Sequence, residues 1–205
     1  MADLAPKPRS AFAGLAVPGR YGRADGKAGS LIAERPSLTL KQVCARRSKT
    51  REMLESVRGA LGLKIEDASK RVALDGLAVT GTAPGQWLAI AEGPTGADLL
   101  MRMERAVDGL ATVVDQSDAK AILRLWGTRA RDVLAKGCPL DLHELALRPN
   151  DTAVTQIALI PCQLWQLDEE PTFELGIPLS YARSFWSWLT ASAAEYGYEV
   201  KPPLS

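Results

Sequence analysis

Two predicted helix starts carry guanidinium and ammonium groups, the side chains that bind phosphate and carboxylate in proteins. Arg51 ends a basic stretch over residues 46–51, and Arg129 and Arg131 open a second predicted helix. Positive charge is unfavourable at the positive end of a helix dipole. An anion, or acidic side chains of a partner protein, would explain the pattern, and a solvated charged surface is the alternative. Arg51, Arg129 and Arg131 are therefore candidate interface residues.

Side chains for nucleophilic, metal or nucleotide chemistry are sparse. His143 is the only histidine, and no cysteine lies at metal-ligand spacing from it. The sequence contains no G-x-S-x-G elbow, no G-x-G-x-x-G fingerprint and no P-loop. The carboxylates that could form an acid–base pair lie in predicted turns, where solvation explains them more simply: Asp115, Asp118, Glu169 and Glu170. We therefore expect no catalytic, cofactor-binding or metal-binding residue in this chain.

Composition and charge exclude several classes of protein. The net charge of +1 provides no field that would attract nucleic acid. The sequence has no run of about 18 apolar residues, so we expect no transmembrane helix. Residues 1–9 lack the apolar stretch of a secretory signal. Cys44, Cys138 and Cys162 are widely spaced and fit reduced thiols, so we expect a cytoplasmic protein without nucleic-acid or membrane partners.

Residues 178–200 predict an amphipathic helix that carries two of the five tryptophans. Ser180 is a suitable N-cap, and Phe185 and Trp188 share one helical face. Trp186 lies about 160° around the helix from Trp188. Because only one face can enter this chain's own core, we expect Trp186 to need a second cover and to anchor an interface.

The hydrophobic periods predict the elements that position these side chains. Glycine and proline are frequent over residues 1–29, which predicts an irregular N-terminal arm. Strand, helix, strand, strand, helix and strand follow, at residues 31–45, 50–62, 71–80, 86–91, 95–110 and 111–116.

The same order recurs in the second half, at residues 121–126, 128–137, 153–167, 172–177, 178–197 and 198–201. We therefore predict an α+β fold with two consecutive ferredoxin-like β-α-β-β-α-β repeats. Repeat one covers about residues 30–117 and repeat two about 121–201, with helices on one face of each sheet.

Three segments of the second half carry a resemblance to a known family. They are V-V-D-Q-S-D-A-K-A-I-L-R-L-W-G-T-R-A-R-D-V-L-A-K-G-C-P-L-D-L-H (113–143), T-A-V-T-Q-I-A-L-I-P-C-Q-L-W-Q-L-D (152–168) and P-T-F-E-L-G-I-P-L-S-Y-A-R-S-F-W-S-W-L (171–189). In these segments the chain resembles the gamma subunit of heterotetrameric sarcosine oxidase. The first half fits in length and element order but is less distinctive.

The resemblance implies a fold, partners and cofactors. The family is related to the folate-binding domain of the glycine-cleavage aminomethyltransferase, so residues 30–205 would form one folate-binding-domain-like α+β body. The implied partners are the alpha, beta and delta subunits. Together they would oxidise sarcosine with O2 to glycine, hydrogen peroxide, and formaldehyde or 5,10-methylenetetrahydrofolate. NAD, FAD and covalent FMN would belong to the alpha and beta subunits, zinc to the delta subunit, and tetrahydrofolate would accept the one-carbon unit.

No catalytic residue is carried over from the family, and the acidic residue with which folate-binding relatives hold the pterin matches no position here. We therefore expect a non-catalytic structural subunit. One alternative is a stand-alone folate or one-carbon binding protein. Another is an anion or nucleic-acid adaptor that uses the arginine-rich helix starts, which the low net charge disfavours.

Overall fold

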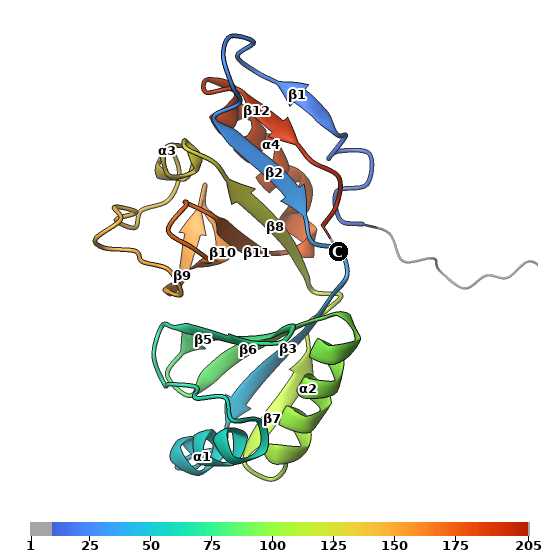
Figure 1. The fold of residues 1–205 in the computed structure, drawn as a ribbon, viewed down its shortest axis with the longest axis vertical. Coiled ribbons are helices and arrows are strands. Elements are labelled where there is room, and N and C mark those ends of the chain that lie inside the picture. The colour runs from blue at the N-terminus through green and yellow to red at the C-terminus, as the bar shows by residue number, and fades with distance from the viewer. Residues whose placement is uncertain (1–9, 205) are drawn as a thin grey trace, which may run out of the picture.

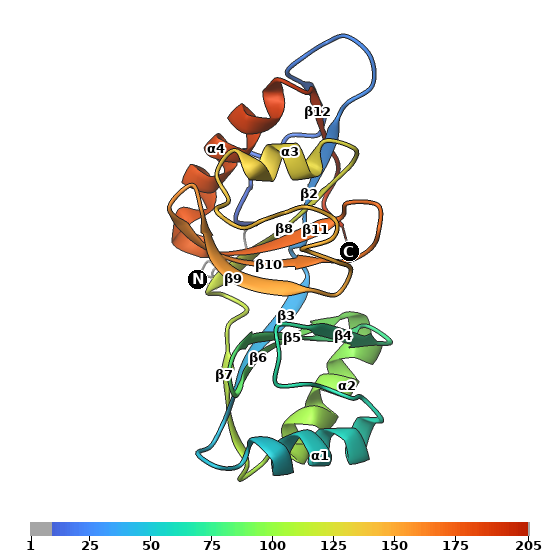
Figure 2. The ribbon, with the colours of Figure 1, turned by 90° about the vertical axis from the view of Figure 1, so that its left-hand side faces the viewer.

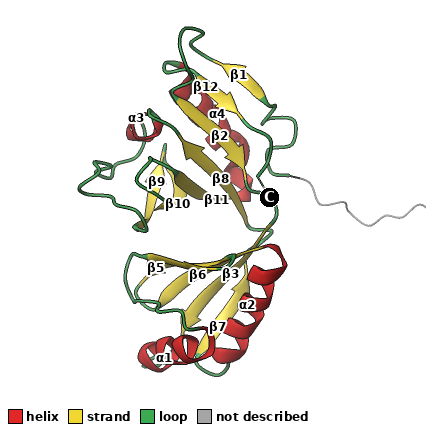
Figure 3. Cartoon of the chain, in the orientation of Figure 1, coloured by secondary structure: helices red, strands yellow, loops and turns green. Residues whose placement is uncertain are grey.

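Two β-sheets, each covered by helices on its outer side, make up the part of the chain that this computed structural model describes, residues 10–204 (Figure 3). The two sheets with their helices lie at opposite ends of the long axis, and their helix-free faces are turned toward each other (Figure 1). The α+β fold class predicted from the sequence is confirmed.

The smaller sheet has five antiparallel strands in the order β4-β5-β6-β3-β7. Their bounds in that order are Arg71–Leu74, Leu77–Ala83, Gln86–Glu92, Leu38–Ala45 and Ala111–Asp115. Helices α1 (Thr50–Leu61) and α2 (Gly93–Ala106) cover one face. Alternate strand residues such as Val79 and Trp87 enter the core under these helices, because side chains alternate between the faces of a strand.

The larger sheet has seven strands in the order β1-β12-β2-β8-β11-β10-β9. Their bounds in that order are Gly19–Tyr21, Tyr198–Val200, Ser30–Glu34, Lys120–Trp126, Phe173–Pro178, Ile160–Gln166 and Thr152–Ile157. Helices α3 (Ala130–Ala135) and α4 (Ala182–Ala194) lie on its outer face. All neighbouring strands are antiparallel except β12 and β2, which are parallel.

The chain follows the order β-α-β-β-α-β in each sheet, from β3 to β7 and from β8 to β12, with β1, β2, β4 and β9 as additional strands. The predicted start of repeat one at residue 30 is wrong, because β2 pairs with β8 and β12 of the larger sheet. The chain crosses to the smaller sheet at residues 35–37 and returns at residues 116–119 (Figure 2). Two connections therefore join the sheets.

The predicted strand over residues 31–45 is two strands in different sheets. Pro36 lies between β2 and β3 and has no N–H to donate to a ladder. The sequence shows this break, but the partner sheet of β2 is fixed by residues far along the chain, since Leu31 pairs with Trp126.

Two further predicted strands are hairpins. Residues 71–80 turn at Asp75 and Gly76, whose φ angles are 42° and 86°. Residues 153–167 turn at Ala158 and Leu159, with φ angles of 51° and 65°. Two-residue turns with positive φ match the twist of antiparallel strands. Asp-Gly is a recognisable signal for such a turn, whereas Ala-Leu is not.

The predicted arm has no helix or strand over residues 10–18 and 22–29, as expected, but residues 19–21 form a strand and the arm packs on the larger unit; residues 1–9 lie outside the described residues. Phe12 is only 1% exposed and belongs to the core of the larger sheet. Gly19–Tyr21 forms the edge strand β1 and pairs with β12. The N-terminal segment is thus held by the same sheet that carries the C-terminal strand.

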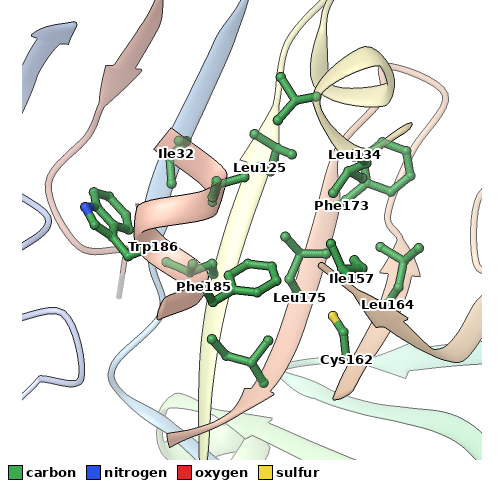
Figure 4. Close-up of a cluster of buried hydrophobic side chains, with 14 of the residues drawn as sticks. Ile32, Leu125, Leu134, Ile157, Cys162, Leu164, Phe173, Leu175, Phe185 and Trp186 are labelled. Atoms are coloured by element: carbon green, nitrogen blue, oxygen red, sulfur yellow. The ribbon is translucent and has the colours of Figure 1, made fainter. Parts of the chain in front are cut away.

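The core of the larger unit lies between its sheet and helices α3 and α4. Figure 4 shows Leu175 of β11 beside Phe185 of α4, and Phe173 of β11 near Leu134 of α3; all four are 0% exposed. Ser180 does not cap this helix, because it lies in a 3-10 turn (Leu179–Tyr181) and α4 begins at Ala182. Among the helices of residues 10–204, none is long and apolar enough to cross a membrane.

A third buried layer fills the space between the sheets. The smaller sheet contributes Leu40, Ala78, Leu88 and Ile90, and the larger sheet contributes Ile122 and Trp165. At one edge, the Arg71 N–H donates to the Asn150 carbonyl at 2.7 Å, and the Thr152 hydroxyl donates to the Gly81 carbonyl at 2.8 Å. Apolar packing and directional hydrogen bonds together fix one sheet against the other.

Candidate functional site

A buried ion cluster lies between the sheets, beside this apolar layer. At its centre is Glu174 of β11, whose side chain is 6% exposed. Its Oε1 accepts hydrogen bonds from Arg35 Nη1 at 3.0 Å and Arg124 Nη2 at 2.6 Å, and its Oε2 accepts one from Trp165 Nε1 at 2.8 Å. Arg35 Nη2 also pairs with Glu92 Oε2 at 2.6 Å. The cluster therefore links β8, β10 and β11 of the larger sheet to β6 of the smaller one.

Strand alternation places Glu174 in this position. Phe173 and Leu175 point toward the helices, so the side chain between them points toward the other sheet. A buried carboxylate is tolerated only where charge and hydrogen bonds compensate its lost hydration. Two guanidinium groups and one indole N–H supply that compensation here.

A cavity of about 170 Å³ adjoins the cluster, and its lining includes Arg71 together with Arg35, Arg124, Glu92 and Glu174. Desolvation lowers the pKa of Arg71; the charge of Glu174 opposes this shift, and the positive charges of Arg124 and Arg35 add to it. Three cationic side chains thus face two carboxylates around one small space.

The arginines of this cavity are incompletely satisfied within residues 10–204. The Nε atoms of Arg35 and Arg71 are buried and have no hydrogen-bond partner. The side-chain hydrogen bond of Arg71 is one from Nη1 to Asn150 Oδ1, at 3.5 Å. Arg71 forms no ion pair with a carboxylate of the described chain. This arrangement can hold an anion.

A second cavity, of about 330 Å³, lies beside the two connections between the sheets. Glu34, Arg35, Ser117 and Lys120 are among its lining residues. Burial lowers the pKa of Lys120, and the buried Glu34 accepts a hydrogen bond from the Ser10 hydroxyl. Its polar groups come from the crossing points of the chain, so the cavity belongs to the junction of the two units.

The three candidate interface arginines are not brought together. Arg51 on α1 has a side chain that is 90% exposed and pairs with Glu55 at 3.0 Å, one turn further along the helix. Arg129 precedes α3 on the larger sheet and pairs with Asp132 at 3.0 Å. Charge on these helix starts is therefore partly neutralised within each helix.

The side chain of Arg131 is engaged in contacts within the larger unit. Its Nη2 donates to Gln166 Oε1 at 3.1 Å, its Nη1 donates to the Leu142 carbonyl, and its Cζ lies 5.3 Å from the centroid of the Phe173 ring. The guanidinium thus ties α3 to β10 and to the loop that follows α3. Of the three arginines, Arg51 and Arg129 leave more of their charge at the surface.

The expected exposure of the two helical tryptophans is reversed. Trp186 is 8% exposed, and its ring centroid lies 5.6 Å from that of Phe12. Trp188 is half-buried and lies beside Gly137 and Phe185. The prediction that Trp186 needs a cover from another protein is wrong, because the N-terminal segment of this chain supplies the cover.

His143 takes part in a turn, and Cys138 and Cys162 are buried thiols. His143 Nδ1 accepts a hydrogen bond from the Leu145 N–H at 3.2 Å, within a turn. Burial raises the pKa of the Cys138 and Cys162 thiols, which keeps them protonated. Within residues 10–204, no group of three or more histidine, cysteine, aspartate or glutamate side chains is placed to hold a metal ion.

Sequence reasoning missed the inter-sheet cluster. Arg124 lies within the apolar strand A-I-L-R-L-W and Glu174 within F-E-L-G-I-P, so each looks like the solvated side of a half-buried strand. A charged residue inside two neighbouring apolar strands is the one available signal. The sequence does not show that Arg35, in the connection between the sheets, and Arg71, in β4 of the smaller sheet, approach the same place.

The two-sheet α+β fold is similar to that of a solved aminomethyltransferase. The glycine cleavage aminomethyltransferase from Bartonella henselae matches with a TM-score of 0.58 at 21% identity, over 82% of this chain and 50% of that chain. The model of the sarcosine oxidase, gamma subunit family matches residues 49–195, and the chain belongs to that family.

Individual relatives agree with this assignment. The chain is 35% identical to a sarcosine oxidase subunit gamma from Corynebacterium sp. (strain P-1), over 62% of this chain and 61% of that relative. The alignment thus spans about three fifths of the relative's length. A chain of heterotetrameric sarcosine oxidase from Corynebacterium sp. U-96, solved with pyrrole 2-carboxylate, matches with a TM-score of 0.77 and 27% identity, over 92% of this chain and 95% of that chain.

Proposed function

We propose that this chain is the gamma subunit of a heterotetrameric sarcosine oxidase and that its role there is structural. The observation that carries the proposal is the match to a chain of the Corynebacterium enzyme, which spans nearly the whole of both chains. The family match over residues 49–195 supports it independently of the fold comparison.

In this proposal the partners are the alpha, beta and delta subunits, and the assembly is cytoplasmic. It would demethylate sarcosine with O2 to glycine, hydrogen peroxide, and formaldehyde or 5,10-methylenetetrahydrofolate. NAD, FAD, covalent FMN, zinc and tetrahydrofolate would be bound by the partners. The space between the sheets of this chain supports a structural role, because Trp165, Leu40, Leu88 and the ion cluster occupy much of it.

The decisive experiment is co-expression of the tagged chain with the three candidate partner subunits. The purified material is analysed for mass, flavin absorbance and oxygen consumption with sarcosine. We expect a stoichiometric yellow complex that turns over sarcosine. A colourless, well-folded monomer would contradict the proposal. Saturable quenching of its tryptophan fluorescence by tetrahydrofolate would then favour a stand-alone folate-binding protein.

The same complex tests Arg51 as an interface residue. Arg51→Glu reverses a charge whose side chain is 90% exposed, so folding should be unaffected while recovery of the complex falls. Lys64→Glu is the matched control, because Lys64 is also an exposed cation beside a carboxylate, Glu66. Equal recovery of both variants would place Arg51 outside the interface.

A further inference from the structure

We propose that the cavity between the sheets binds a small free carboxylate ion, held by the guanidinium of Arg71 with support from Arg35 and Arg124. The inference goes beyond the proposed function and does not depend on it. It rests on the surplus of positive charge around the cavity, on the absence of an ion pair for Arg71 within residues 10–204, and on the size of the space.

The charge surplus is localised at Arg71. Glu174 is shared between Arg35 and Arg124, and Glu92 pairs with Arg35, so both carboxylates of the cavity are engaged by other arginines. A desolvated guanidinium without a counter-ion is costly, and an anion that enters the cavity removes this cost.

The geometry of the donors favours a planar carboxylate over a spherical ion. A guanidinium presents parallel N–H groups that match the two oxygens of a carboxylate. Within the described chain, the guanidinium of Arg71 makes one side-chain hydrogen bond, from Nη1 to Asn150 Oδ1 at 3.5 Å, and no ion pair. A halide ion can accept hydrogen bonds but cannot match the two-pronged spacing.

The cavity volume limits the size of the ligand. At about 170 Å³ the space is below the roughly 300–1,000 Å³ of ordinary small-molecule pockets and well above the ~30 Å³ share of one water molecule. Ions of one to a few carbon atoms, such as formate and acetate, fit this range. The turn at Gly76 forms part of the wall, and a Cβ at this position would come within 2.6 Å of the Glu92 carbonyl oxygen.

The test is titration of the full-length chain with sodium formate at constant ionic strength, with sodium chloride as the balancing salt. Calorimetry should show saturable binding of formate, and the melting temperature should rise with formate relative to equal chloride. Absence of both effects in the folded native chain would overturn the proposal.

Variants locate the site. Arg71→Lys keeps the positive charge but removes the parallel N–H donors of the guanidinium, so formate affinity should fall by about tenfold or more. Glu92→Gln removes a competing carboxylate and should tighten binding. Arg51→Lys is the matched control and should leave affinity unchanged, because Arg51 is exposed on α1. Formate binding that is the same in all three variants would place the ion elsewhere and overturn the assignment.

Discussion

The two faces of strand β11 differ in how they are satisfied. Toward the helices, Phe173, Leu175 and Ile177 are 0% exposed and pack in an apolar core. Toward the smaller sheet, Glu174 is nearly as buried but depends on three named partners from three different segments. The apolar face tolerates any close-packed neighbour, whereas the polar face needs partners at hydrogen-bonding distance, and the Arg35–Glu92 pair extends this requirement to the smaller sheet.

The comparison indicates a division of roles. The hydrophobic effect supplies most of the stability of each unit and is non-directional. The ion cluster fixes the orientation of one unit relative to the other, because its hydrogen bonds require particular distances and angles. Substitutions on the two faces of β11 should therefore differ in how much they lower the free energy of unfolding. Those on the apolar face should weaken the core of the larger unit, and those on the polar face should weaken the ion cluster.

The largest effect is expected from Phe173→Ala. Truncation of a fully buried phenylalanine leaves a cavity and should lower the free energy of unfolding by about 3–5 kcal/mol. Urea unfolding of native chain and variant measures this difference. Leu159→Ala, at an 87% exposed turn residue, should change stability by no more than about 0.5 kcal/mol. A similar loss in both variants would contradict the apolar core as the main source of stability.

A smaller loss is expected from Glu174→Gln on the opposite face. The amide keeps the shape but loses the negative charge that Arg35 and Arg124 share, at a cost of about 1.5–3 kcal/mol. The urea midpoint gives the loss, with the exposed Glu170→Gln as the control. If Glu174→Gln were neutral, the charge of Glu174 would not stabilise the cluster.

Arg124→Met should cost less again, about 1 kcal/mol. The Arg124 side chain is 26% exposed, so water partly screens its attraction to Glu174, and Arg35 still neutralises that carboxylate. Arg51→Met, which removes an exposed helical pair, should cost about 0.3–0.5 kcal/mol. A loss for Arg124→Met as large as that for Glu174→Gln would mean that Arg35 cannot compensate.

The weakest effect is expected at Asp115, an exposed carboxylate that serves as a contrast to Glu174. The Ser117 backbone N–H, then the Ser117 hydroxyl and Lys41, lower the pKa of Asp115 to about 2. Because this folded pKa is below the ordinary value of 3.8, the stabilisation is present above about pH 4 and is lost as the pH falls toward 2. Asp115→Asn should thus lower the urea midpoint slightly at pH 7 but much less near pH 2.5. An equal difference in urea midpoint at both pH values would contradict the lowered pKa of Asp115.

Several features of the chain were determined by the sequence itself. The alternation of Phe173, Leu175 and Ile177 and the helical spacing around Phe185 follow from local periodicity, which the structure confirms, whereas three of the predicted strands are each two strands. The family resemblance rests on contiguous segments, and the family match confirms it.

Only the tertiary structure decided which polar side chains meet. Glu174 and Arg124 looked solvated because a strand pattern does not show that a second sheet covers its polar face. Arg35, Arg71 and Glu174 converge from positions up to 139 residues apart. The cover of Trp186 by Phe12 and the insertion of β2 into the larger sheet are likewise long-range contacts. Local sequence fixes the conformation of each segment, but the faces that come together depend on the packing of both units at once.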